Sequence, residues 1–188
     1  MKQSEIIKLL SDKELKRSLI LSQSLFLALS LIGSILLFEN ITDWFSFFQI
    51  ELKEIIVYGL LPGILIVLID LILMYALPKK YYDDGGINER IFTSLNSSEI
   101  FFICILIAVS EELLFRGVLQ TTFGYIPASV IFALVHVRYL SKPVLLISVL
   151  LISFFIGYLF EVTGNLYVTI FAHFTVDFIL GLVIRYQK

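Results

Sequence analysis

Six ionisable side chains lie inside stretches of the sequence that are otherwise apolar. They are Glu111, Glu112, Arg116, His136, His173 and Asp177. The two histidines are the only ones in the 188-residue chain. A charged side chain at bilayer depth costs on the order of 2.5–3.5 kcal/mol on insertion scales, so such residues are expected to have a function or a partner. Carboxylates and imidazoles at this depth can transfer a proton, hold a water or bind a metal.

The spacing of these residues predicts which side chains share a helix face. Glu112 and Arg116 are four residues apart and therefore face one another on a helix. His173 and Asp177 have the same spacing. Glu111 points about 100° away from Glu112 around the helix axis, so one carboxylate can serve chemistry while Arg116 holds the other. Taken singly, Glu112–Arg116 also fits a structural ion pair, and a membrane histidine also fits an interhelical hydrogen bond.

Six apolar segments are expected to carry these residues across a membrane. Hydrophobic residues make up 59% of the chain and charged residues 16%, against roughly 45–50% and about 25% in soluble domains. Since only helices satisfy every backbone group within one segment in lipid, we expect an all-α polytopic transmembrane bundle. The expected segments are Ser18–Phe38, Ile55–Leu77, Glu99–Gln120, the short Ile126–Val137, Pro143–Phe160 and Leu166–Ile184. Ser11 and Glu14 match a capping box, which predicts a helix start there.

These helices would bring the ionisable residues to one depth. With a rise of about 1.5 Å per residue, Glu111 lies about 18 Å from the cytoplasmic side and His136 about 15 Å from the other side. His173 and Asp177 lie about 10 Å and about 17 Å from that far side. In a hydrocarbon core of about 30 Å, all four fall near the middle. Residues far apart in the sequence therefore converge on one candidate site.

The connecting segments predict an orientation and a division of the chain. Positive residues recur on every second connection, which predicts that both termini lie in the cytoplasm. The net charge of −2 gives no electrostatic basis for binding nucleic acid, and leaves the lipid bilayer as the first expected partner. The long connection 78–98 would separate an N-terminal region with two transmembrane helices (1–97) from a catalytic helical core (98–188). The small size favours a prokaryotic plasma membrane.

Three short motifs, in this order, resemble those of the CAAX-protease and bacteriocin-processing (CPBP) family of intramembrane proteases, which includes the Rce1-like proteases. Glu111–Arg116 matches E-E-x-x-x-R, Phe132–His136 matches F-x-x-x-H, and His173–Asp177 matches H-x-x-x-N/D. The resemblance extends from about Glu99 to the C-terminus. Motifs of other intramembrane proteases, H-E-x-x-H, G-x-S-x-G and G-x-G-D, do not occur in the sequence.

The resemblance implies an intramembrane endopeptidase acting on a membrane-associated peptide or protein, such as a prenylated or bacteriocin-type substrate. Glu111 would be the general base that activates a water, and His136 would hold that water. Glu112 with Arg116 would support the local structure and electrostatics. These roles come from the resemblance, and the spacing is compatible with them.

His173 and Asp177 would lie on the oxyanion side of the site. Relatives with Asn at the second position have an amide donor there, whereas an ionised Asp177 would repel an oxyanion. Asp177 is therefore either protonated or orients the His173 ring, and we favour the second interpretation.

Other functions stay open from the sequence. A zinc ion held by Glu112, His136 and His173 would make the chain a metalloendopeptidase. Intramembrane Glu, His and Asp also form the proton relays of transporters. A non-catalytic immunity or scaffold protein could keep the same motifs. Asp70, inside the second span, has no expected partner and is assigned to helix packing or to substrate access.

Overall fold

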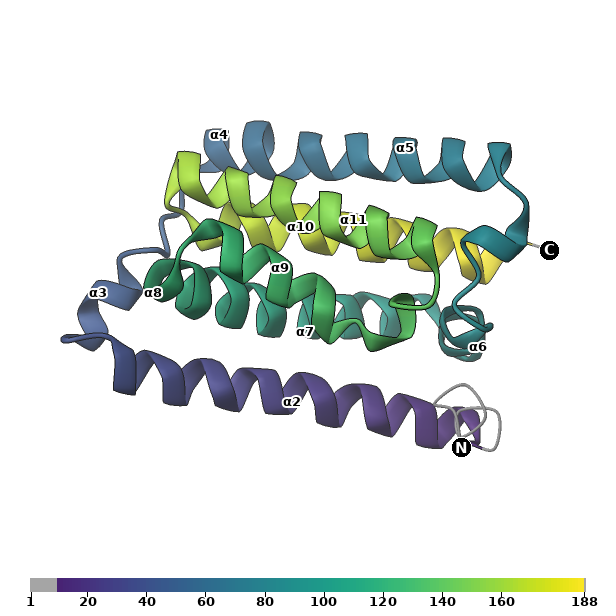
Figure 1. The fold of residues 1–188 in the computed structure, drawn as a ribbon, viewed down its shortest axis with the longest axis horizontal. Coiled ribbons are helices and arrows are strands. Elements are labelled where there is room, and N and C mark those ends of the chain that lie inside the picture. Colours follow the sequence, from purple (N-terminus) through teal and green to yellow (C-terminus); the bar gives the residue numbers. More distant parts are fainter. Residues whose placement is uncertain (1–9, 188) are drawn as a thin grey trace.

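The computed structural model describes residues 10–187, and every regular element within that range is a helix. Within that range, five long helical segments and one short one run back and forth along one axis (Figure 1). They are α2 (Asp12–Leu37); α4 (Leu52–Glu54) with π-helical η1 (Ile55–Leu60) and α5 (Leu61–Ala76); α7 (Ser97–Leu114) with π-helical η3 (Phe115–Gln120) and α8 (Thr121–Phe123); α9 (Tyr125–Val135); α10 (Pro143–Thr163); and α11 (Leu166–Tyr186). Helix α2 begins and α11 ends at the same end of the bundle, and which side of a membrane this end faces stays a prediction.

The helical membrane bundle expected from the sequence is confirmed. Within residues 10–187, four helices are long and apolar enough to cross a membrane: Asp12–Leu37, Leu52–Ala76, Pro143–Thr163 and Leu166–Tyr186. Helix α9 is the expected short apolar helix. Helix α7 is not among the four, and it carries three acidic residues in its 18 positions. Helix α2 begins at Asp12 instead of Ser18, because Ser11 and Glu14 form the predicted capping box.

Helix α2 buries three polar residues in its membrane-spanning part and exposes most of its apolar ones. Gln23, Ser30 and Ser34 are buried, whereas most of its leucines and isoleucines are exposed. Since lipid solvates apolar side chains, helix contacts in a membrane favour small and polar residues. A Cβ at Gly33 would lie 2.8 Å from Cγ1 of Val118, so glycine lets α2 approach η3 closely. The buried face of α2 is therefore the one that reaches the site.

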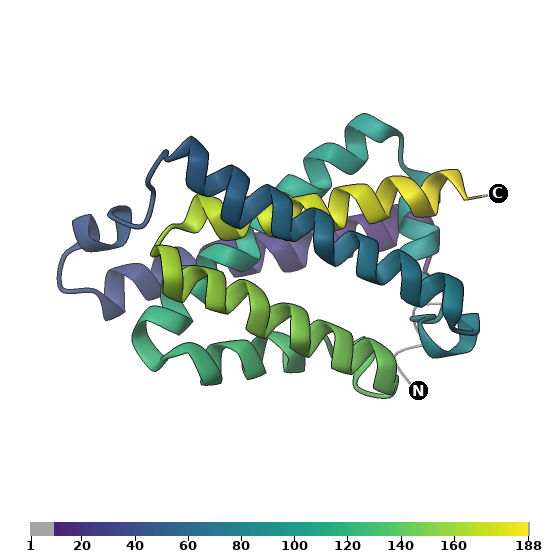
Figure 2. The same ribbon diagram turned by 90° about the horizontal axis from the view of Figure 1, so that it is seen from above.

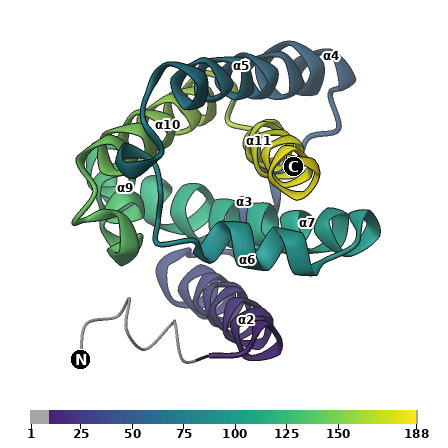
Figure 3. The ribbon, with the colours of Figure 1, turned by 90° about the vertical axis from the view of Figure 1, so that its right-hand side faces the viewer.

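Helix α11 occupies the centre of the bundle. Seen from one end, it lies between α5 and α7, while α2 lies outside α7 (Figure 3). Seen from above, α5 crosses α11 obliquely (Figure 2). A Cβ at Gly59 would lie 2.9 Å from the carbonyl oxygen of Val168, and one at Gly63 would lie 2.9 Å from that of Ala172. This G-x-x-x-G spacing brings the two helices into close contact.

Short helices fill the connections that the sequence interpretation left as loops. They are α3 (Ile41–Phe45), η2 (Lys79–Tyr81), α6 (Ile87–Ser94) and η4 (Val137–Tyr139). Asp84 caps α6 by accepting from the backbone N–H of Ile87 at 3.0 Å. At the other end of the bundle, the indole N–H of Trp44 donates to the carbonyl of Gly117 at 3.0 Å. The N-terminal helices thus pack directly on the expected catalytic core, and the division at residue 97 stays a prediction.

Candidate active site

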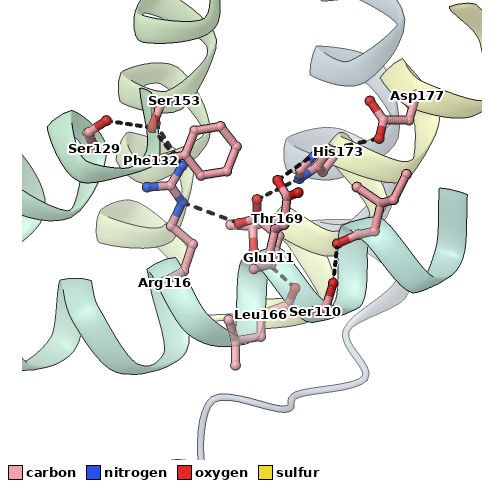
Figure 4. A network of polar contacts seen from close by, with 12 residues as sticks. Ser110, Glu111, Arg116, Ser129, Phe132, Ser153, Leu166, Thr169, His173 and Asp177 are labelled. Atoms are coloured by element: carbon pink, nitrogen blue, oxygen red, sulfur yellow. Dashed lines mark hydrogen bonds and ion pairs between the residues drawn. The ribbon is translucent and has the colours of Figure 1, made fainter. Parts of the chain in front are cut away.

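The expected site residues come together inside the bundle from three directions. Glu111 and Glu112 lie at the end of α7, Arg116 lies on η3, His136 caps α9, and His173 and Asp177 lie on α11. Figure 4 shows the Arg116 side chain directed toward Ser153, and His173 beside Asp177. The π-helical turn begins directly after α7, and such turns are frequent at functional sites.

Glu112 and Arg116 form a fully buried ion pair. Both side chains have 0% exposure, and Nε of Arg116 donates to Oε2 of Glu112 at 3.3 Å. Nη2 of Arg116 donates to the carbonyl and the hydroxyl of Ser153, both at 3.1 Å. The Ser153 hydroxyl in turn donates to the carbonyl of Ser129 at 3.1 Å. This pair therefore ties η3 to α9 and α10, and the guanidinium also lies over the Phe132 ring, 5.2 Å from its centroid.

His173 contacts three carboxylates. Its Nδ1–H donates to Oε1 of Glu112 at 2.8 Å. Its Nε2 lies 3.6 Å from Oδ2 of Asp177 and 4.0 Å from Oε2 of Glu111. The hydrogen bond that orients the ring thus comes from Glu112, not from Asp177 as the sequence interpretation favoured. Asp177 lies on the Nε2 side, where the ring is open to the cavities described below.

Glu111 has one bonded oxygen and one free oxygen. Oε1 accepts a hydrogen bond from Nε2 of Gln23 at 3.0 Å, across 88 positions of sequence. Oε2 is buried and has no hydrogen-bond partner among residues 10–187. The contact with Gln23 was missed from the sequence, where the only signal was a polar residue, between Ser22 and Ser24, in an otherwise apolar span.

His136 packs against aromatic side chains at the edge of the site. Its Nδ1 lies 2.8 Å from the carbonyl oxygen of Phe132. Because a carbonyl only accepts, Nδ1 carries the proton and a neutral ring keeps its lone pair on Nε2. The ring stacks on Tyr139 with centroids 5.6 Å apart, and the Phe132 ring contacts both His136 and His173. Burial raises the pKa of the Tyr139 phenol, whose oxygen accepts from Asn88.

Two cavities meet at the site. The first cavity, of about 520 Å³, lies between α5, α9, α10 and α11, and Asp70 is on its wall. The second cavity, of about 450 Å³, lies between α2, α6 and α7, and Glu111 is on its wall. Both are lined by His136, His173 and Asp177. The site can therefore be approached from two sides, and Asp70 faces one of these approaches.

The residues expected to hold a zinc ion do not fit a metal. Within residues 10–187, no group of three or more His, Cys, Asp or Glu side chains is placed to bind one. The two oxygens of Glu112 are bonded to His173 and to the Arg116 guanidinium, and that guanidinium would repel a cation. Glu112, His136 and His173 therefore do not form a zinc-binding group among the described residues, and the zinc alternative has no support from this arrangement. The single cysteine, Cys104, is buried and unpaired.

Fold and site together define a helical integral membrane protein with a buried centre of carboxylates and imidazoles. The chain belongs to the Rce1-like family, because the family model "Type II CAAX prenyl endopeptidase Rce1-like" matches residues 93–179. The resemblance of the three motifs is thereby confirmed. The "Uncharacterized protein YpbD" of Bacillus subtilis (strain 168) is 41% identical over 167 residues, which cover 89% of this chain and 88% of the relative. No solved structure matches the chain.

The two similarities cover different lengths of the chain. The family model begins at residue 93 and leaves out α2 and α5. The similarity to the Bacillus protein is much longer and therefore includes part of the N-terminal region. Sequence similarity thus extends beyond the three motifs to helices that pack around them.

Proposed function

We propose that this chain is an intramembrane endopeptidase in which Glu111 activates a water against a peptide bond. The free oxygen of Glu111 carries this proposal, because it is buried, unbonded and 4.0 Å from Nε2 of His173. Because this oxygen is on the wall of the second cavity and no protein group bonds it, it can accept a hydrogen bond from a water there. The family description, a CAAX prenyl endopeptidase, supplies the reaction.

In the proposed first step, a water binds between Oε2 of Glu111 and Nε2 of His136. Both residues line the second cavity, and the lone pair on His136 accepts one hydrogen of the water. Glu111 removes a proton as the water oxygen attacks the carbonyl carbon of the substrate. Glu111 then returns this proton to the amide nitrogen as the C–N bond breaks.

His173 is proposed to face the oxyanion that forms in this step. Its Nδ1–H is used by Glu112, so a proton on Nε2 makes the second nitrogen a donor toward the cavities. Such a fixed donor stabilises developing charge strongly in a site without bulk water. Glu112 and Arg116 hold this ring in place, and Asp177 lies 3.6 Å from the donating nitrogen.

The first cavity is the proposed binding place of a membrane-anchored substrate. Its wall is largely apolar, with side chains such as Leu73, Val144 and Ile152. An apolar or lipid-modified segment would be solvated there as well as in the bilayer, while its peptide reaches His136 and His173. A prenylated peptide and a bacteriocin-type peptide both fit this description.

Membrane peptides from cells that produce the wild-type chain or Glu111→Gln would test the proposal. Cleaved peptides are expected with the wild type and with the control Glu39→Gln, an exposed acid outside the site. They are expected to be missing with Glu111→Gln, although that variant keeps its thermal unfolding temperature in detergent. The same peptides from Glu111→Gln cells would remove Glu111 from its role. Proton-coupled flux in liposomes without any cleavage would support a proton-relay transporter instead.

A further inference from the structure

Gln23 of α2 is bonded to the residue that the proposed mechanism uses as its base. Its side chain is 4% exposed and lies on the buried polar face of a helix that otherwise faces lipid. Its Nε2 donates to Oε1 of Glu111 at 3.0 Å. Its Oε1 accepts from the hydroxyl of Ser110, the residue before Glu111. One amide is therefore held at both ends by neighbouring positions of α7.

The two hydrogen bonds fix the direction of the amide. Because the Glu111 carboxylate only accepts, the NH₂ group of Gln23 faces it and the amide oxygen faces the Ser110 hydroxyl, which also contacts the carbonyl oxygen of Ile107 at 3.1 Å. A flipped amide would set its oxygen against the carboxylate and lose a charge-assisted hydrogen bond. Ser110 therefore acts on Glu111 through Gln23.

The hydrogen bond to Oε1 of Glu111 also fixes the direction of the other carboxylate oxygen, Oε2. A carboxylate that is bonded through one oxygen cannot rotate freely, so its second oxygen keeps one direction. That second oxygen is the unbonded one, on the side of His173. Gln23 thus presents a single oxygen of Glu111 to the second cavity, whose wall both residues form.

We propose that Gln23 is a positioning residue for Glu111, supplied by a helix outside the family-matched segment 93–179. This inference rests on the proposed function of Glu111. It makes α2 part of the active site rather than only a membrane anchor. Two other contacts hold α2 in register with α7 and η3, namely the Lys16–Glu99 ion pair at 2.6 Å and the close approach at Gly33.

Gln23→Met tests the inference because methionine keeps the length of the side chain and removes both hydrogen-bonding groups. Cleavage of the peptides found in the proteomic comparison is expected to slow by about 10- to 100-fold, as when a hydrogen-bonded partner of a catalytic group is removed. Gln23→Ala is a second variant with the same expected loss, should one of the two fail to fold. Ser30→Ala, which removes another buried polar group of α2, is the matched control and should stay within about twofold.

An infrared measurement distinguishes a role of Gln23 in positioning Glu111 from a role in helix packing alone. The carboxyl band of Glu111 is defined by the difference between wild type and Glu111→Gln. It should move in Gln23→Met and stay in place in Ser30→Ala. Ser110→Ala combined with Gln23→Met should slow cleavage no more than Gln23→Met does, since the two residues act through one contact.

Each adverse outcome identifies the statement that fails. Wild-type cleavage by Gln23→Met, with Glu111→Gln inactive, would overturn the positioning role and leave the proposed function intact. An unmoved Glu111 band in Gln23→Met would also overturn the positioning role. Cleavage by Glu111→Gln would overturn the proposed function itself.

Discussion

The two carboxylates beside His173 are neighbours in sequence but differ in their bonding. Glu112 is completely buried, and its oxygens are bonded to His173 at 2.8 Å and to Arg116 at 3.3 Å. Glu111 is 5% exposed, with one oxygen bonded to Gln23 and the other unbonded. Glu111 also lines a cavity, whereas Glu112 lines neither of the two cavities at the site.

In the proposed mechanism, this difference in bonding assigns Glu112 to supporting the fold and Glu111 to reacting with water. A buried charge with a complete set of partners cannot bind a water without giving one of them up. A carboxylate oxygen that no protein group bonds, on the wall of a cavity, can accept a hydrogen bond from a water without giving up another partner. The helical offset of about 100° between adjacent residues is enough to send the two acids to these different surroundings.

The largest expected effect separates the two acids by activity. Glu111→Gln should slow cleavage by about 10²–10⁴-fold, the usual contribution of a general base. It should change the free energy of unfolding by less than about 1 kcal/mol, because glutamine keeps the shape and can still accept from Gln23. Cleavage assays and unfolding in detergent measure the two quantities. A large loss of stability with little loss of rate would reverse the assignment of the two acids.

The next prediction tests the supporting role of Glu112 through the free energy of unfolding. Arg116→Met removes the guanidinium partner of the buried Glu112 and should lower the free energy of unfolding by about 3–5 kcal/mol. Lys16→Met breaks the half-exposed pair with Glu99 and is the control, with an expected loss below about 1 kcal/mol. Adding Glu112→Leu to Arg116→Met should restore part of the stability. Cleavage should stay impaired, because His173 has lost the acceptor of its Nδ1–H. Equal losses for Arg116→Met and Lys16→Met would contradict the supporting role.

The local part of this arrangement could be predicted from the sequence. Long apolar runs predict membrane helices because each must satisfy its own backbone groups in lipid. The capping box at Ser11 and the Glu112–Arg116 pair were predictable because both depend only on residues within one helical turn. The short helices α3 and α6 were missed, since their few residues lie in polar connections without a long apolar run.

The partners that distinguish the two acids could not be predicted. Gln23 and Glu111 are 88 positions apart, and Glu112 and His173 are 61 apart, so their contacts depend on how whole helices pack. The spacing of His173 and Asp177 predicted a shared face correctly. This spacing could not reveal that Glu112 lies closer to the His173 ring than Asp177 does and accepts the hydrogen bond from Nδ1–H.

A smaller effect tests how much the close packing of α5 against α11, the helix that carries His173, contributes to stability. A Cβ at Gly63 would lie 2.8 Å from Cβ of Thr175 and would force α5 and α11 apart. Gly63→Ala should therefore lower the free energy of unfolding by about 1–3 kcal/mol, as overpacking does. Leu61→Ala, on the lipid-facing side, is the control and should change it by less than about 0.5 kcal/mol. An unchanged stability in Gly63→Ala would show that the two helices can separate without cost.

The smallest expected effect concerns Asp70, which faces the first cavity and so lies on the opposite approach from Glu111. If Asp70 contacts the substrate, Asp70→Asn should weaken cleavage of peptides with a basic residue near the cut by up to about tenfold, or ~1.4 kcal/mol. Neutral peptides should be cleaved at the wild-type rate, because a wall charge acts mainly on complementary charge.

If Asp70 serves helix packing instead, the same substitution should change the stability of the bundle and affect all peptides alike. Ranking the cleaved peptides by charge, beside the exposed control Asp43→Asn, distinguishes the two roles. The first result would divide the site into a substrate-selecting side on α5 and a water-activating side on α2 and α7. The second would leave substrate selection to the apolar wall of the first cavity and Asp70 to the contact between helices.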